Sequence, residues 1–218
     1  MAIVTLKQLW KNEYFQTAVM IILTVAIVFG FWYSLQLVLN TQYPALAVAS
    51  GSMCMLPGSD CDGWSHPFER TLHVGDLILV QGVDAKGIKA EPYPDGDIIV
   101  FHRPSLTDDR IVHRAIRKET YNGKIYFRTQ GDGNGSPDYH YGEGTWNGMV
   151  SQDLVIGKVI LRIPWIGHLS LFMQESSGTI IIITLIIVII IVEFVIPAFT
   201  SKEAQTEQKK DSEKDFET

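Results

Sequence analysis

Residues 18–39, AVMIILTVAIVFGFWYSLQLVL, decide the architecture of this 218-residue chain. The segment carries no charge, and as a helix rising about 1.5 Å per residue it spans roughly 30 Å, the thickness of a bilayer's hydrocarbon core. Trp32 and Tyr33, near its end, are residues that favour the membrane–water interface. The segment therefore predicts a transmembrane helix that anchors the chain.

A cleavable signal peptide is the alternative interpretation of this segment. Ala45-Leu46-Ala47 and Ala47-Val48-Ala49, just beyond it, resemble the small-residue pattern at which such peptides are cut. The apolar run is, however, longer than the roughly 7–15 residues of a signal-peptide core. A retained anchor fits the segment better.

A second apolar segment, residues 177–199, predicts another transmembrane helix. Residues 180–192 are almost continuous Ile, Val and Leu, so they are apolar on every face. The segment reaches the full thickness of a bilayer only if residues 194–199 are included, which places Glu193 inside it. A single carboxylate so close to the end of a span is expected to reach the headgroups.

The lysines that flank the two apolar segments predict their orientation. Loops rich in Lys and Arg stay on the cytoplasmic side, whereas acidic residues have little influence. The flanking lysines are Lys7 and Lys11 before the first segment, and Lys202, Lys209, Lys210 and Lys214 after the second. Residues 1–17 are thus expected to be a cytoplasmic N-terminus, and residues 200–218 a disordered, polar cytoplasmic tail.

Residues 41–176 lie between the two segments and have the pattern of one extracytoplasmic β-domain. Short runs of β-branched and aromatic residues predict strands, and turns rich in Gly, Asn and Asp separate them. The expected strands are Leu77–Val80, Ile98–Phe101, Ile111–Ile116, Ile125–Arg128 and Val155–Leu161. Helical periodicity is almost absent here. The predicted fold class is mainly β, flanked by an N-terminal and a C-terminal transmembrane helix.

The charge of the chain limits its partners. The formal net charge is −6, and no stripe of Lys and Arg runs along the sequence. Nucleic acid is therefore not an expected partner, since a nucleic-acid-binding surface needs such a basic footprint. A membrane location and catalysis at the membrane surface stay open.

Cys54 and Cys61 are the only cysteines, and they fall in the part of the chain placed outside the cytoplasm. An oxidising compartment favours a local disulfide between them. Two free thiols, or a metal site with Asp60, Asp62 or His66, are the alternatives. The spacing does not match a tetrahedral ligand set, so no metal is expected.

Ser50-Gly51-Ser52-Met53 is the stretch that suggests chemistry. In an extended chain the two hydroxyls lie on one side, so one can attack a carbonyl while the other donates to the developing oxyanion. Such a run is more often a solvated turn. A nucleophilic serine also needs a base and an acceptor to orient it, for which His113 and either Asp132 or Asp138 are candidates. Sequence spacing leaves the choice of acceptor open.

Five motifs along the chain resemble those of type I signal peptidases, in the same order and at similar spacing. They extend over about residues 48–167, and together they are far more specific than any one of them. The chain is most similar to the archaeal and endoplasmic-reticulum branch of that family. The motifs are Ser50–Met53, Asp97–Phe101, Val112–Arg114, Gly131–Asn134 followed by Asp138, and Ile156–Val159.

The resemblance implies roles for individual residues. It makes Ser52 the nucleophile and His113 the general base, at a position where bacterial members of the family have lysine. Asp138 is implied as the third member, with Asp132 an important acidic neighbour, and Ser50 as an oxyanion-hole donor. The chain departs from the family in a long insertion, residues 54–74, which alters the expected rim of the substrate pocket.

The function implied is removal of signal peptides from secreted preproteins, by cleavage after small residues at the outer surface of a cell or endoplasmic-reticulum membrane. No cofactor is expected. Preproteins, membrane lipid and the protein-translocation channel are the expected partners, and the peptide is expected to bind as an added strand. The alternatives are a non-enzymatic, membrane-anchored binding or assembly protein, and self-processing at Ala47 or Ala49.

The surroundings of the candidate residues lead to further expectations. Asp132 lies between two glycines, so its carboxylate is expected to accept hydrogen bonds from the amides of its own turn. Asp138 follows Pro137, which stiffens the backbone. His140 is a rival base, and the other histidines are interpreted as structural or surface residues. An apolar rim facing the membrane is expected at Trp165, Ile166, Leu169 and Phe172.

Overall fold

The computed structural model describes residues 10, 13–56, 61, 64 and 70–191. The predicted tail of residues 200–218, most of the predicted N-terminal segment and Glu193 lie outside these ranges. The chain divides into two compact units, Met1–His168 and Leu169–Thr218, which are described separately below.

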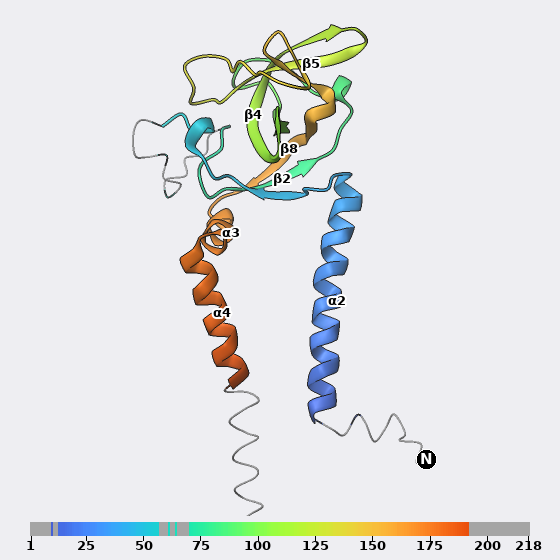
Figure 1. The fold of residues 1–218 in the computed structure, drawn as a ribbon, viewed down its shortest axis with the longest axis vertical. Coiled ribbons are helices and arrows are strands. Elements are labelled where there is room, and N and C mark those ends of the chain that lie inside the picture. The colour runs from blue at the N-terminus through green and yellow to red at the C-terminus, as the bar shows by residue number, and fades with distance from the viewer. Residues whose placement is uncertain (1–9, 11–12, 57–60, 62–63, 65–69, 192–218) are drawn as a thin grey trace, which may run out of the picture. The chain divides into compact units, whose positions relative to one another are not determined.

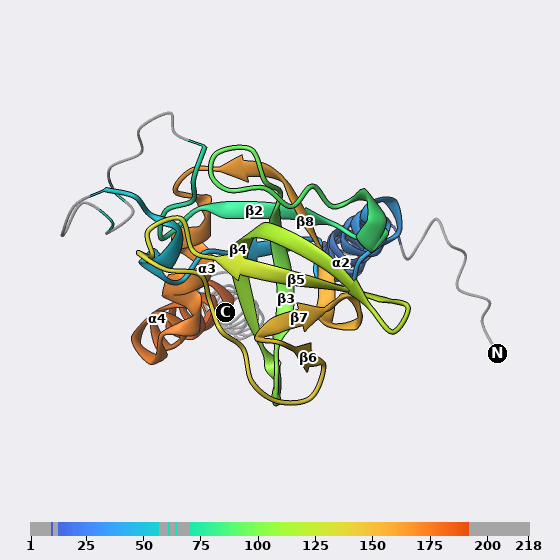
Figure 2. The ribbon, with the colours of Figure 1, turned by 90° about the horizontal axis from the view of Figure 1, so that it is seen from above.

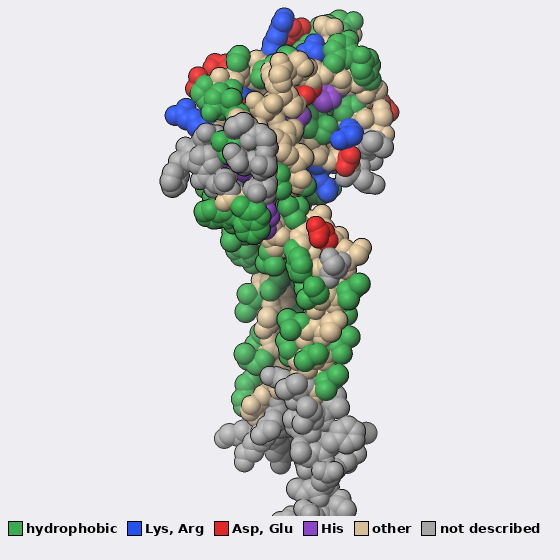
Figure 3. Space-filling model, turned by 90° about the vertical axis from the view of Figure 1, so that its left-hand side faces the viewer, with side chains coloured by type: hydrophobic (Ala, Val, Ile, Leu, Met, Phe, Trp, Pro, Cys, Tyr) green, Lys and Arg blue, Asp and Glu red, His purple; other side chains and the backbone are tan. Residues whose placement is uncertain are grey.

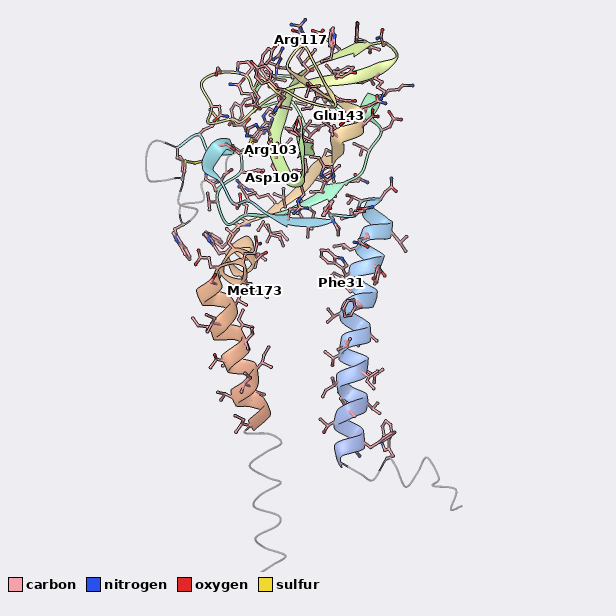
Figure 4. The ribbon with its side chains drawn as sticks, in the orientation of Figure 1. Phe31, Arg103, Asp109, Arg117, Glu143 and Met173 are labelled. Carbon is pink, nitrogen blue, oxygen red and sulfur yellow. A yellow bond between two sulfur atoms is a disulfide. The ribbon has the colours of Figure 1, made fainter. Side chains whose placement is uncertain are left out.

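Helix α2 (Glu13–Leu39) contains the first apolar segment, beginning five residues before the prediction and ending with it at Leu39. Its most apolar stretch is not buried by the rest of the protein, and Phe31 points away from the helix (Figure 4). Hydrophobic side chains line the helical segments (Figure 3). Asn40, with a φ of 49°, ends the helix. Among the described residues, α2 is the only helix that by itself is long and apolar enough to cross a membrane.

The first unit also contains an eight-stranded antiparallel sheet in the order β1-β2-β8-β3-β4-β5-β7-β6 (Figure 1). Seen from above, the sheet curls into a half barrel (Figure 2). The strands are β1 (Ala45–Ala47), β2 (Leu77–Gln81), β3 (Ile98–Arg103), β4 (Leu106–Tyr121), β5 (Lys124–Gln130), β6 (Thr145–Trp146), β7 (Met149–Ser151) and β8 (Val155–Ile163). Short 3₁₀ helices in the described connections are η1 (Gly51–Met53), η3 (Ala85–Gly87) and η4 (Gln152–Leu154).

Two apolar clusters cover the two faces of the sheet. Successive strand residues point to opposite faces, so Val100 of β3 joins one cluster while its neighbours Ile99 and Phe101 join the other. The first cluster is Val48, Met53, Leu72, Ile78, Val80 and Val100. The second is Ile88, Ile99, Phe101, Ala115, Phe127 and Val150. Because Met53 belongs to the first cluster, the core fixes the segment next to Ser52.

The structure agrees with the mainly β prediction and adds elements that the sequence pattern did not indicate. All five expected strands are present, as β2, β3, β4, β5 and β8, whereas β1, β6 and β7 were not predicted. Among the described residues of 41–176, one α-helix is an exception to the expectation that helix is almost absent: α3 (Ile166–Gln174), which spans most of the predicted apolar rim. Leu169 and Phe172 of that rim are exposed, as are Trp165 and Ile166.

The second unit contains α4 (Ser176–Ile190), which begins where the second apolar segment was predicted. Its 15 residues rise roughly 22 Å at about 1.5 Å each, which is less than a bilayer's hydrocarbon core. Together with α3, from which it is bent by 92°, it is apolar and long enough to cross. Residues 192–199 of the predicted span lie outside the described ranges, so a complete C-terminal transmembrane helix stays a prediction.

Candidate active site

Ser52 lies in the middle of η1 (Gly51–Met53), immediately after an extended residue. Ser50 has φ −131° and ψ 154°, and the chain then turns sharply into the 3₁₀ helix. Met53 is buried in the first cluster, and its carbonyl accepts a hydrogen bond from the hydroxyl of Thr71. The apolar packing and this hydrogen bond both hold Met53 in place. The neighbouring Ser52 side chain is half-buried at the surface of the domain.

The glycine-rich loop after β5 packs directly against the backbone of η1. The amide of Gly133 donates to the carbonyl of Ser52 over 3.0 Å. A Cβ atom on Gly131 would lie 2.4 Å from that same oxygen, and one on Gly133 would lie 2.1 Å from the carbonyl oxygen of Cys54. These contacts leave no room for a side chain, which explains why glycine occupies both positions.

His113 links Ser52 to Asp138. It lies on β4, paired with Ile99 of β3, and its side chain is only 10% exposed. Nε2 lies 2.9 Å from the Ser52 hydroxyl oxygen, and Nδ1 lies 2.6 Å from Oδ2 of Asp138. A carboxylate can only accept, so Nδ1 carries the proton of the neutral ring, and Nε2 is left to accept from Ser52.

Asp138 is held at two points by Thr129 of β5. Its amide donates to the Thr129 carbonyl over 2.8 Å, and the Thr129 hydroxyl donates to Oδ2 of Asp138 over 2.8 Å. Burial raises the pKa of the Asp138 carboxyl, but the hydrogen bond and charge of His113 and the hydrogen bond of Thr129 outweigh it and leave the pKa below its ordinary value. The carboxylate is therefore ionised at neutral pH.

Asp132 is bound by Arg114, not by the amides of its own turn, so the expectation for its carboxylate was wrong. Arg114 Nε donates to Oδ1 over 2.7 Å and Nη2 to Oδ2 over 2.5 Å, with both side chains almost fully buried. Arg114 also donates to the carbonyls of Gly96 and Arg70. The guanidinium reaches the turn because Arg114 and His113 are consecutive on β4 and point to opposite faces.

The Ser50 hydroxyl oxygen lies 3.4 Å from that of Ser52. Ser50 is exposed to solvent. The two hydroxyls are neighbours although η1 breaks the extended conformation that the sequence argument assumed.

His140, the rival base, does not contact Ser52. Its Nε2 lies 2.9 Å from the Thr129 hydroxyl, and its ring packs edge-on against Phe101. Burial lowers the pKa of His140, and the charges of His113, Arg128 and Arg103 add to that effect although Asp138 opposes it.

Thr129, which contacts Asp138, was not among the residues predicted from the sequence. It lies opposite Ala115 in the β4–β5 pair, on the His113 face, and that register is visible only in the folded sheet.

Cys54 and Cys61 are joined by a disulfide, which closes the first part of the insertion beside η1. Asp60, Asp62 and His66, named as possible metal ligands, lie outside the described residues. Within the described ranges no group of three or more His, Cys, Asp or Glu side chains is arranged to hold a metal ion.

The sequence is similar to catalytic subunits of signal peptidase complexes, although no protein-family model matches it. The catalytic subunit SEC11 of Eremothecium gossypii is 31% identical over 158 residues, which cover 71% of this chain and 80% of the relative. The chain belongs to the SEC11 family of signal peptidases. Human SEC11C is 28% identical over 172 residues, 78% of each chain, and SEC11 of Tuber melanosporum is 26% identical over 158 residues.

The candidate residues of this SEC11-family chain form two separate groups. Ser52, His113 and Asp138 form one continuous line of hydrogen bonds. Asp132 with Arg114 forms a separate buried ion pair. The first group has the geometry that activates a serine nucleophile, whereas in the second group the Asp132 carboxylate is bound by the Arg114 guanidinium.

Proposed function

We propose that Ser52, His113 and Asp138 are the catalytic triad with which this membrane-anchored SEC11 protease removes signal peptides from preproteins. Signal-peptide removal is the activity of the family to which the chain belongs, and it disfavours the non-enzymatic alternative. The observation that supports the triad is the line of contacts from Ser52 Oγ to His113 Nε2, 2.9 Å, and from His113 Nδ1 to Asp138 Oδ2, 2.6 Å.

The proposed reaction follows from the proton positions. His113 Nε2 takes the hydroxyl proton as Ser52 Oγ attacks the carbonyl carbon of the scissile bond, and Asp138 stabilises the imidazolium that forms. His113 then gives the proton to the leaving amine, which breaks the C–N bond and leaves an ester on Ser52. Water, deprotonated by the same histidine, hydrolyses the ester and restores the serine.

Ser50 is proposed to donate a hydrogen bond to the oxyanion of the tetrahedral intermediate. Its hydroxyl is exposed and 3.4 Å from that of Ser52, so it can turn toward an oxygen bonded to the attacked carbon. Loss of one oxyanion donor costs on the order of 10²–10³ in kcat. Ser50→Ala should lower kcat by about that factor. An unchanged kcat would remove Ser50 from the mechanism.

The preprotein is proposed to bind as an extended strand along the edge of the sheet. β1 is an edge strand, and the chain runs from it directly toward Ser52. Main-chain hydrogen bonds along such an edge fix a peptide regardless of its side chains, while shallow pockets select small residues before the cut. Ala47 already lies within β1, which argues against self-processing there.

The anchoring is proposed to use both apolar segments, residues 18–39 and 177–199, with both termini cytoplasmic and residues 41–176 on the outer side. Only about a dozen residues separate Leu39 from Ser52, so even an extended chain, at about 3.3–3.6 Å per residue, keeps the serine close to the bilayer. Lipid headgroups and the translocation channel are the partners that this location implies, in the endoplasmic-reticulum or cell membrane.

Cleavage of a preprotein by the full-length chain, purified in detergent, tests the nucleophile. Ser52→Ala should abolish cleavage without unfolding the domain, because a nucleophile has no substitute. Ser136→Ala is the matched control. Ser136 is exposed in the glycine-rich loop after β5, so its replacement should leave the cleavage rate unchanged. Cleavage by Ser52→Ala at the native rate would exclude Ser52 as the nucleophile.

A further inference from the structure

The line of hydrogen bonds does not stop at Asp138. The Thr129 hydroxyl touches two side chains, Oδ2 of Asp138 at 2.8 Å and Nε2 of His140 at 2.9 Å. His140 Nε2 is itself 3.8 Å from Asp138 Oδ2, which is too far for a hydrogen bond. Any effect of His140 on Asp138 through hydrogen bonds therefore passes through Thr129.

The direction of these hydrogen bonds follows from counting protons. An ionised carboxylate only accepts, so the single hydroxyl proton of Thr129 is given to Asp138. The hydroxyl oxygen then has only lone pairs to offer, so His140 must donate from Nε2–H. The lowered pKa of His140 is consistent with a neutral ring, whose proton is then on Nε2.

We propose that His140 is a positioning residue of the site: by donating to the Thr129 hydroxyl it fixes that hydroxyl on Asp138, and so fixes the carboxylate that orients His113. The inference rests on the triad proposed above. Without the His140 donor the Thr129 hydroxyl can rotate and donate its proton to other acceptors. The hydrogen bond from Thr129 to Asp138 is then formed only part of the time.

Packing holds the relay in one arrangement. Thr129 is fully buried, and its backbone carbonyl binds the Asp138 amide. The His140 amide donates to the carbonyl of Gly148 over 3.1 Å, and the ring packs edge-on on the buried Phe101. Both ends of the relay are therefore fixed by backbone as well as by side chains, as preorganised sites require.

A double-mutant cycle on the full-length chain in detergent tests the proposal, with kcat and KM for a preprotein as the readout. Thr129→Val removes the hydroxyl at constant shape and should lower kcat about 10-fold, because Asp138 loses a charge-assisted hydrogen bond. His140→Phe keeps the ring and should lower kcat about fivefold. Neither change should alter KM, since both residues lie behind His113 as seen from Ser52.

The coupling between the two changes decides the question. If His140 acts through Thr129, then adding His140→Phe to Thr129→Val should cost nothing further in kcat. His140→Gln, which can place an amide donor near the Nε2 position, should recover most of the kcat lost in His140→Phe. Ile88→Val, which trims the second apolar cluster at a residue that is not part of the relay, should lower Tm and leave kcat unchanged.

Three results would overturn the relay: losses in kcat that multiply in the double variant, a His140→Gln variant as slow as His140→Phe, or a His140→Phe variant that lowers Tm alone. Failure of the triad itself looks different. In that case Ser52→Ala retains cleavage, whatever the variants of Thr129 and His140 do.

Discussion

At the scale of single residues, the site depends on the alternation of side chains along one strand. His113 and Arg114 are neighbours on β4 and point to opposite faces, and each binds one aspartate of the same glycine-rich connection. Asp138 thereby orients the histidine, whereas Asp132 neutralises a buried guanidinium. Two carboxylates that look equivalent in the sequence have different tasks.

The two aspartates should respond differently to replacement by asparagine. Asp138→Asn should keep its fold and lose about 10⁴ in kcat, because an amide favours the wrong tautomer of the histidine. Asp132→Asn should lose less activity and more stability, since breaking a buried ion pair costs about 3–5 kcal/mol. Cleavage rates and melting temperatures of both variants check this. A folded but inactive Asp132→Asn would reverse the assignment.

The lowered pKa of His140 makes stability depend on pH. In the folded protein its pKa lies below the ordinary 6.5, so the unfolded chain takes up a proton first as the pH falls. The free energy of unfolding should therefore decrease as the pH falls below about 6.5, until the folded pKa is reached. His140→Phe should lose less stability over that window. Urea midpoints between pH 7 and pH 5 measure the difference, and parallel curves would contradict it.

At the scale of elements, the glycine-rich loop acts as the support of η1. Gly133→Ala should displace the Ser52 backbone, because its Cβ would lie 2.1 Å from the Cys54 carbonyl oxygen. We expect kcat to fall by at least about 10-fold and Tm to fall as well. Gly135→Ala is the control, since a Cβ there meets no atom within 4 Å. Equal activities of the two variants would show that the contact does not position Ser52.

The elements differ in how far the sequence predicts them. β2, β3, β4, β5 and β8 were predicted because their β-branched runs are long enough to show a pattern, whereas β1, β6 and β7 have two or three residues and form only against a neighbouring strand. The proposed nucleophile, Ser52, and the proposed base, His113, lie in recognisable motifs. The Arg114 partner of Asp132 and the Thr129 contact to Asp138 come from strand register and loop packing, which no local pattern encodes.

At the scale of the whole molecule, the orientation of the termini awaits a test. Cysteines introduced at Thr5 and Ser201 should react with a membrane-impermeant maleimide only after the membrane is permeabilised, because lysine-rich flanks stay cytoplasmic. A cysteine at Ser136 should react from the outer side in intact vesicles. Cys54 and Cys61 are joined to each other and should not interfere. Labelling of Ser201→Cys without permeabilisation would place the tail outside.

The short connection between α2, which ends at Leu39, and β1, which begins at Ala45, also governs how the enzyme meets its substrate. With the anchor in the lipid, enzyme and signal peptide search for one another by lateral diffusion in two dimensions. Their encounter rate then depends on copies per unit of membrane area, not per unit of volume. Added lipid should slow cleavage by dilution even when the volume stays constant.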